Sequence, residues 1–127
     1  MIKIKYRKDE NDRLDPHHAD IYMTRGDTLL SSLTLMLSNG AEYTPTEDDT
    51  VRFAVKKRYS DSTPLINVDV PLTETDDDTV MLLLRVEPAQ TKSLRFGTYV
   101  YDLEITYDDG VVDTFLSGDL ILTEEVH

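Results

Sequence analysis

The chain has 127 residues, a length that suits one domain and is short for two. Its 25 acidic and 13 basic side chains give a formal net charge of −12, which disfavours binding to phosphate backbones and anionic lipid surfaces. Because there is no cysteine, disulfides, thiolate metal sites and cysteine nucleophiles are excluded. No apolar run approaches the roughly 18 residues of a membrane span, and the first residues lack the apolar region of a secretory signal. We therefore expect a protein made in the cytoplasm that binds neither nucleic acid nor membrane.

The N-terminal residues Met1–Ala19 are mostly polar and include the charged segment Arg7–Arg13. We predict that they form a loosely held arm, or a strand that becomes ordered only against a partner. The folded domain is then expected to span residues 20–127. Its first element is a short strand, indicated by Ile21 and Met23.

Alternation of apolar and polar residues with period two predicts the other strands. The clearest are Thr50–Arg58 and Thr98–Tyr107. Their apolar faces carry Val51, Phe53 and Val55 in the first, and Tyr99, Tyr101, Leu103 and Ile105 in the second. The remaining predicted strands are Leu29–Leu37, Ile66–Val70, Val80–Val86 and Val112–Leu122. The total is about seven strands.

Turn signals separate these strands. Asp108–Gly110 predicts a tight hairpin, because an Asp-Gly pair accepts the positive φ of a primed turn, and Ser38–Ala41 contains a similar Asn-Gly pair. The triplet Arg25–Asp27 matches an integrin-binding sequence, but such triplets are common by chance and we interpret it as a turn. Gly118, inside the last predicted strand, indicates a bulge or a bend.

One segment, Pro88–Leu94, predicts one or two helical turns, since proline suits the first helical position. About seven strands with so little helix indicate an all-β protein, specifically an antiparallel β-sandwich. The segment Leu94–Tyr99 resembles the corner of an immunoglobulin-like sandwich in which a tyrosine hydroxyl bonds to upstream backbone, so we predict an immunoglobulin-like antiparallel β-sandwich. Tyr99 is therefore interpreted either as a structural tyrosine corner or as a core aromatic residue.

Acidic residues cluster at three predicted turns, namely Glu47–Asp49, Asp76–Asp78 and Asp108–Asp109. Such clusters supply hard oxygen ligands for a divalent cation, but aspartate is also a common turn former, and none has the spacing of a helix-loop-helix calcium site. A glycosidase would need two carboxyl groups in a cleft, which the sequence does not indicate. His17, His18 and His127 are expected to be exposed to solvent. We predict no catalytic residue, cofactor or metal site.

Several segments together carry a family resemblance. They are Met23–Thr28, Val51–Lys57, Phe96–Ile105, the hairpin Asp108–Gly110 and the terminal Gly118–Leu122. In this order they resemble the small immunoglobulin-like domains encoded by phages and prophages of Firmicutes, in particular the N-terminal domain of the baseplate upper protein family. The resemblance implies a non-enzymatic virion component that attaches tail or baseplate parts to one another. It brings no catalytic residues.

A protein of this kind is expected to act through an exposed strand edge that accepts a partner strand. The candidate contacts are the arm Met1–Ala19 and the strand Leu65–Val70, with Leu65, Asn67 and Asp69 as interface residues. Leu30 and Met36 are either further interface residues or lie on the second side of a strand buried on both faces. The expected partners are other virion proteins or a second copy. The alternative is a carbohydrate-binding module of a virion or cell-surface protein, although the seven tyrosines are accompanied by no tryptophan.

Overall fold

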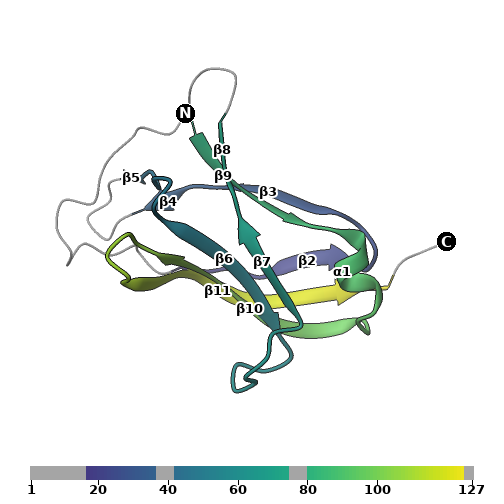
Figure 1. The fold of residues 1–127 in the computed structure, drawn as a ribbon. Helices are drawn as coiled ribbons and strands as arrows, with labels where there is room; N and C mark the ends of the chain where they lie inside the picture. Colours follow the sequence, from purple (N-terminus) through teal and green to yellow (C-terminus); the bar gives the residue numbers. More distant parts are fainter. Residues whose placement is uncertain (1–16, 37–41, 75–79, 125–127) are drawn as a thin grey trace.

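The computed structural model describes residues 17–36, 42–74 and 80–124, which form two facing β-sheets (Figure 1). In the larger sheet the order is β7–β6–β10–β11, with β1 and β2 both lying along the other side of β11. Its strands are β1 (His17–His18), β2 (Ile21–Thr24), β6 (Thr50–Lys56), β7 (Ile66–Val70), β10 (Gly97–Thr106) and β11 (Val112–Thr123). This arrangement confirms the predicted immunoglobulin-like β-sandwich.

The smaller sheet has the order β3–β9–β8 and lies over the larger one in Figure 1. Its strands are β3 (Leu29–Leu33), β8 (Leu72–Glu74) and β9 (Val80–Val86), and a separate short pair is formed by β4 (Leu35–Met36) and β5 (Glu42–Tyr43). Only Pro71 separates β7 in one sheet from β8 in the other. The chain therefore crosses between the two layers within a single residue.

The core lies between the sheets, where inward-pointing residues of both layers meet. The predicted apolar faces are confirmed, because Phe53, Val55, Leu103 and Ile105 are completely buried. The rings of Phe53 and Tyr101 pack with their centroids 5.7 Å apart. Each large apolar side chain buried in this way stabilises the fold by about 1.5–3 kcal/mol.

Most predicted strands are observed with small changes at their ends, and the differences have local causes. The predicted strand Leu29–Leu37 is interrupted at Thr34, which separates β3 from β4. Three short strands, β1, β5 and β8, were not predicted because two or three residues cannot display a period. His17 and His18, which we assigned to the arm, pair with β11 and so belong to the larger sheet. The other predictions for residues 1–16, 38–41, 76–78 and 127 lie outside the described residues.

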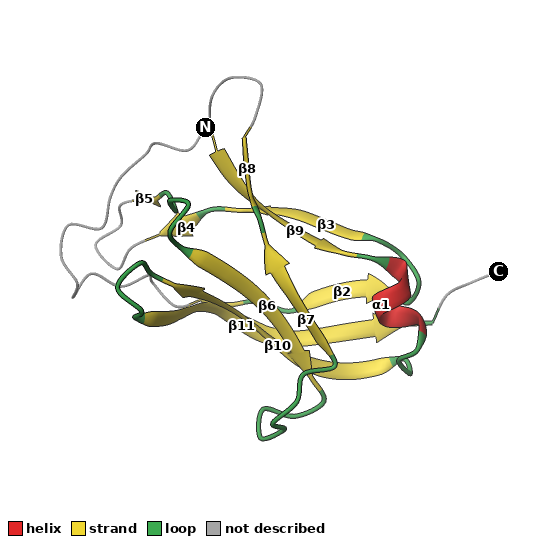
Figure 2. Ribbon diagram, viewed as in Figure 1, coloured by secondary structure: helices red, strands yellow, loops and turns green. Residues whose placement is uncertain are grey.

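The predicted helix is observed as α1 (Pro88–Lys92), drawn red at one end of the sandwich in Figure 2. The side chain of Gln90 accepts a hydrogen bond of 2.7 Å from the Glu87 backbone N–H, which caps the first turn. Its buried Thr91 hydroxyl accepts a hydrogen bond of 2.9 Å from the Gly26 N–H, so the β2–β3 turn is fixed onto the helix. No described helix is long and apolar enough to cross a membrane.

The prediction of a bulge at Gly118 is wrong. The register of β10 and β11 shifts after Leu103, which lies opposite Leu116, whereas Glu104 lies opposite Thr114. The extra residue of the bulge is therefore Phe115. Gly118 instead pairs regularly with β10, and its lack of a side chain serves a close backbone approach described below.

Candidate interaction surfaces

The edge strand β7 carries three of the predicted interface residues. Within the larger sheet it pairs with β6 alone among the described strands, and Leu65, just before it, is 50% exposed. Asn67 and Asp69 are exposed and point outward, as the alternation predicts. Both are already engaged, since Arg52 on β6 donates to the Asn67 side-chain oxygen at 3.1 Å and to an Asp69 carboxylate oxygen at 2.8 Å. This edge therefore presents an apolar side chain next to an exposed ion-pair network.

The edge strand β3 is open in a different way. It pairs with β9 alone among the described strands, and Leu30, Ser31 and Ser32 are all exposed although successive residues point to opposite sides. Leu30 is 55% exposed, so the alternative that it lies buried on the second side of its strand is wrong. Met36 lies on β4, opposite Glu42, and its side chain lies outside the described part of the structure.

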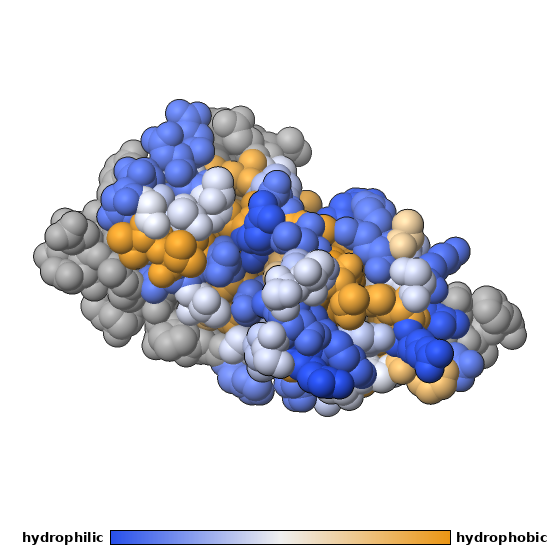
Figure 3. Space-filling model, turned by 60° about the horizontal axis from the view of Figure 1, so that its bottom comes forward, coloured by the Kyte–Doolittle hydropathy of each residue, from blue (hydrophilic) through white to orange (hydrophobic). Residues whose placement is uncertain are grey.

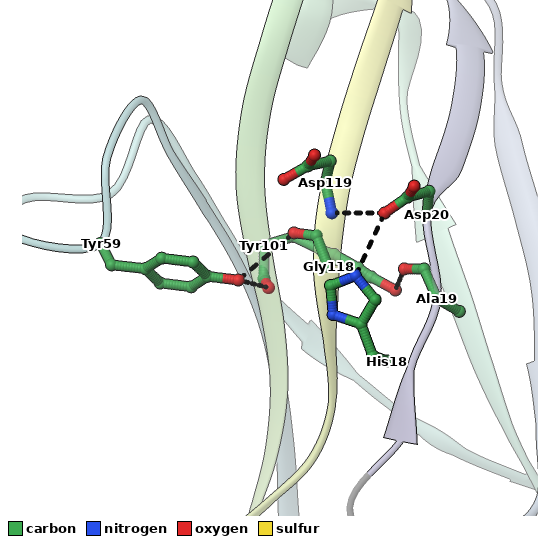
Figure 4. A network of polar contacts seen from close by, with 7 residues as sticks. All are labelled: His18, Ala19, Asp20, Tyr59, Tyr101, Gly118 and Asp119. Atoms are coloured by element: carbon green, nitrogen blue, oxygen red, sulfur yellow. Dashed lines mark hydrogen bonds and ion pairs between the residues drawn. The ribbon is translucent and has the colours of Figure 1, made fainter.

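The opposite edge of the larger sheet is closed by the segment His18–Asp20, which links β1 to β2 and lies alongside β11 (Figure 4). The Ala19 carbonyl oxygen lies so close to β11 that a Cβ atom on Gly118 would be 2.0 Å from it. The Tyr101 hydroxyl, on the next strand, donates a hydrogen bond to the same carbonyl oxygen. Asp20 completes the junction, because its carboxylate accepts a hydrogen bond of 3.1 Å from the Asp119 N–H and lies 3.5 Å from His18 Nε2.

We call this set of contacts the Gly118 junction: Ala19, Asp20, Tyr101, Gly118 and Asp119. Burial raises the pKa of the Tyr101 hydroxyl to about 12, with smaller contributions from Asp20 and Tyr59. The hydroxyl therefore keeps the proton that it donates to the carbonyl oxygen. This junction was not predicted from the sequence, although a glycine inside a strand is also the signal for a close backbone approach.

Tyr59, in the β6–β7 loop, reaches across the outer face of the larger sheet (Figure 4). Its hydroxyl lies 3.5 Å from the Tyr101 carbonyl oxygen and 3.4 Å from that of Gly118. A shallow hollow beside it is lined by Ala54, Lys56, Tyr59, Val100, Tyr101 and Asp102. Burial raises the pKa of the Asp102 carboxyl, and the nearby Lys56 ammonium partly opposes that shift. The hollow thus brings together one carboxylate and one ammonium, without the second carboxylate that glycoside hydrolysis requires.

Two carboxylates of the predicted acidic turns, those of Asp49 and Asp109, have local roles. Asp49 accepts hydrogen bonds from the Tyr43 hydroxyl at 2.5 Å and from the Thr46 N–H at 3.0 Å, and Asp109 accepts one from the Val111 N–H. Among the residues that the structure describes, no three histidine, aspartate or glutamate side chains gather as metal ligands would. These carboxylates stabilise turns.

Tyr99 is buried at the end of the core where β10 begins. Its hydroxyl donates a hydrogen bond of 2.6 Å to the Arg95 carbonyl oxygen, four residues upstream, and the Lys57 ammonium lies 4.7 Å from its ring centroid. The two interpretations of this residue are therefore compatible, because a buried ring and a tie to upstream backbone occur together.

Among the described residues, three aromatic rings are exposed, and they come from three separate segments: Tyr22 on β2, Tyr59 in the β6–β7 loop and Phe96 before β10. In the view of Figure 3 the apolar surface is divided into patches between hydrophilic side chains.

No protein-family model matches the chain, and a comparison with curated proteins gives no match. Among solved structures, the chain is similar to the fibronectin(III)-like modules of Clostridium thermocellum CbhA, with 10% identity, a TM-score of 0.44, and coverage of 91% of this chain and 99% of that one. It is also similar to CopC from Methylosinus trichosporium OB3b, with 12% identity, a TM-score of 0.38, and coverage of 92% and 100%. The expected relation to baseplate upper proteins is not tested by these similarities and stays a prediction.

Proposed function

We propose that this chain is a non-enzymatic binding module, and specifically a structural subunit of a phage or prophage tail or baseplate. The observation that carries the proposal is the open edge of β7, beside which Leu65 exposes half of its surface. Edge strands left open in this way are the usual sites at which a partner strand is added. The exposed Asn67 and Asp69 supply polar side chains along the same edge.

The arrangement of charged groups supports a binding role over a hydrolytic one. Asp69 pairs with Arg52, while Asp49 and Asp113 accept hydrogen bonds from buried tyrosine hydroxyls. These three carboxylates therefore stabilise turns and strand pairing instead of lining a common cleft. The assignment to a phage particle rests on the motif resemblance, whose segments fall on the β2–β3 turn, β6, nearly all of β10, the β10–β11 turn and the end of β11.

The first experiment measures molar mass by light scattering as the concentration of the full chain is raised. We expect a mass above that of the monomer, and we expect Leu65→Asp to return it to the monomer value. Val112→Asp is the matched control, because Val112 is 53% exposed but lies at the start of β11, away from the β7 edge. Equal effects of the two variants would contradict a role for the β7 edge in self-association.

The second experiment tests the particle assignment. An antibody against this chain should label the tails or baseplates of particles produced by the bacterium that encodes it, and the chain should sediment with those particles. Recovery of all the chain in the particle-free fraction would contradict the virion role. Binding to cell-wall glycans on an array, lost in Tyr22→Ala or Tyr59→Ala, would instead favour the carbohydrate-binding alternative.

A further inference from the structure

The sequence around the edge strand β7 is nearly symmetric about Val68. Positions at equal distances from Val68 carry side chains of one kind: two exposed polar, two buried β-branched and two exposed apolar residues. In order outward from the centre, these pairs are Asn67 and Asp69, Ile66 and Val70, and Leu65 and Pro71. Such a strand can lie antiparallel to a second copy of itself with every side chain opposite one of its own kind.

The charge of this edge permits contact between two copies of an acidic chain. Two chains that each carry a net charge of −12 repel one another. From Leu65 to Pro71 the only charged residue is Asp69, and an Arg52 guanidinium nitrogen lies 2.8 Å from one of its carboxylate oxygens. The repulsion is therefore reduced at the β7 edge, because its one carboxylate already has a cation beside it.

The side chains of Asn67 and Asp69 each keep one unused polar atom. Arg52 donates to the Asn67 side-chain oxygen and to one Asp69 carboxylate oxygen. Among the described residues, the Asn67 amide nitrogen and the second Asp69 oxygen have no hydrogen-bond partner. The first is a donor and the second a charged acceptor. With Asn67 directly opposite the partner's Asp69, their Cβ atoms are about 5 Å apart and these two atoms complete each other's hydrogen bonding.

We infer that β7 pairs antiparallel with β7 of a second copy, in the register that places Val68 opposite the partner's Val68. This inference rests on the proposed self-association at the β7 edge and specifies its partner and its geometry. The pair closes about a two-fold axis and joins the two larger sheets into one continuous sheet. Asn67 then meets the partner's Asp69 twice, and Leu65 packs against the partner's Pro71 at each end of the contact.

The neighbouring two-fold registers bring unlike groups together. With Asp69 on the axis, two carboxylates lie directly opposite one another, which destabilises a strand pair. With Asn67 on the axis, Asp69 lies opposite the partner's Leu65, where its free oxygen meets no donor side chain. The register centred on Val68 avoids both mismatches.

The contact is small, and this sets the expected strength of the dimer. The five residues of β7 form a strand about 17 Å long, and interfaces at the small end of the range belong to weak or transient complexes. We therefore expect dimers to appear only as the concentration of the chain is raised. Copies held close together in a larger assembly pair more readily, because their effective concentration is higher.

Exchanging the two polar residues tests the register. Asn67→Asp places a carboxylate opposite the partner's Asp69 at both symmetric positions, and it should raise the dimer dissociation constant by about tenfold or more. The double variant Asn67→Asp with Asp69→Asn again sets one amide opposite one carboxylate, so its dissociation constant should return to within about threefold of the original. Val112→Asp adds the same charge away from this edge and should leave the dissociation constant unchanged.

The outcomes separate this inference from the proposed function. An unchanged dissociation constant in Asn67→Asp, or a loss that the double variant does not restore, would overturn the register. If Leu65→Asp abolishes association in that case, β7 remains the interface and this inference alone fails. A chain that stays monomeric at every concentration would overturn both the inference and the self-association, while the particle assignment keeps its separate test.

Disulfide formation between copies measures the register independently, since the chain has no cysteine of its own. In the inferred register, position 67 lies opposite position 69 of the partner, within the Cα distance that a disulfide spans. The two copies of either position are offset along the strands and lie beyond that distance. A mixture of Asn67→Cys and Asp69→Cys chains should therefore form linked dimers at least about tenfold faster than either variant alone. Faster linkage in one variant alone, or equal rates in all three samples, would overturn the inference.

Discussion

The two edges of the larger sheet are built in opposite ways. On one side β11 is covered by β1 and β2, and the Gly118 junction brings two backbones and the Tyr101 hydroxyl into contact. On the other side β7 has no described neighbour beyond β6, and its outward side chains are tied only by exposed contacts of Arg52. The closed edge requires a glycine at position 118, because any side chain there would meet the Ala19 backbone. At the open edge we expect that the outward side chains can be replaced with little loss of stability.

The largest expected effect lies at the closed edge. Gly118→Ala places a Cβ atom 2.0 Å from the Ala19 oxygen, so the chain at the junction must move away from β11. We expect a loss of about 3 kcal/mol of unfolding free energy, the upper end for overpacking, and a fall in Tm of about 10 °C. Gly110→Asn is the comparison, because nothing lies within 4 Å of its added Cβ; its φ of +84° strains most side chains but asparagine adopts it more readily, so we expect a smaller loss. Similar losses in both variants would remove the distinction between the two edges.

Tyr101→Phe should have the next largest effect. It leaves the Ala19 carbonyl oxygen without this donor and should cost about 1–2 kcal/mol. Because the folded-state pKa is raised from 10.0 to about 12, the hydroxyl contributes stability that is fully present below about pH 10 and is lost as pH rises towards 12. Urea unfolding between pH 8 and pH 12 should therefore show a steeper decline for the original chain than for Tyr101→Phe. Parallel declines would contradict this role, and Tyr59→Phe serves as the control for its longer, more exposed contacts.

At the open edge the effects should be small. Arg52→Ala removes hydrogen bonds to Asn67 and Asp69, but because all three side chains are exposed we expect a loss of only about 0.5 kcal/mol. Urea unfolding in 1 M NaCl should reduce this difference further, since salt screens exposed charges. A loss as large as that of Gly118→Ala would show that both edges are equally constrained.

The smallest effect is expected in the middle of the sheet, at Asp102. Because burial raises its pKa, ionisation of this carboxyl opposes folding at neutral pH, and stability from this group increases as pH falls through the raised value. We expect Asp102→Asn to stabilise the protein by a few tenths of a kcal/mol at pH 7, with the difference vanishing at pH 3. A destabilised variant at pH 7 would instead mean that attraction to Lys56 outweighs burial.

How far the sequence predicts the fold depends on the length of each element. The faces of β6 and β10 follow from alternation alone, because seven to ten residues repeat the pattern several times. The pairing of β1 with β11 joins segments about 100 residues apart and leaves no local pattern in two residues. At the β7 edge, alternation of apolar and polar residues predicts that Asn67 and Asp69 face outward. Their shared contact with Arg52 depends on which residues of β6 and β7 lie opposite one another. The hydrophobic pattern specifies the face of each side chain but not this pairing.

The parallel course of β1 and β2 along β11 also decides how the protein responds to a mechanical load. If residues 17 and 124 are pulled apart, β1–β2 and β11 are drawn in opposite directions along their common axis. Their interstrand hydrogen bonds are then loaded in shear, all together, instead of being opened one after another from an end. A chain incorporated in series between two other parts would therefore resist extension most strongly at the Gly118 junction, and its lifetime under force would follow the unfolding rate rather than the equilibrium stability.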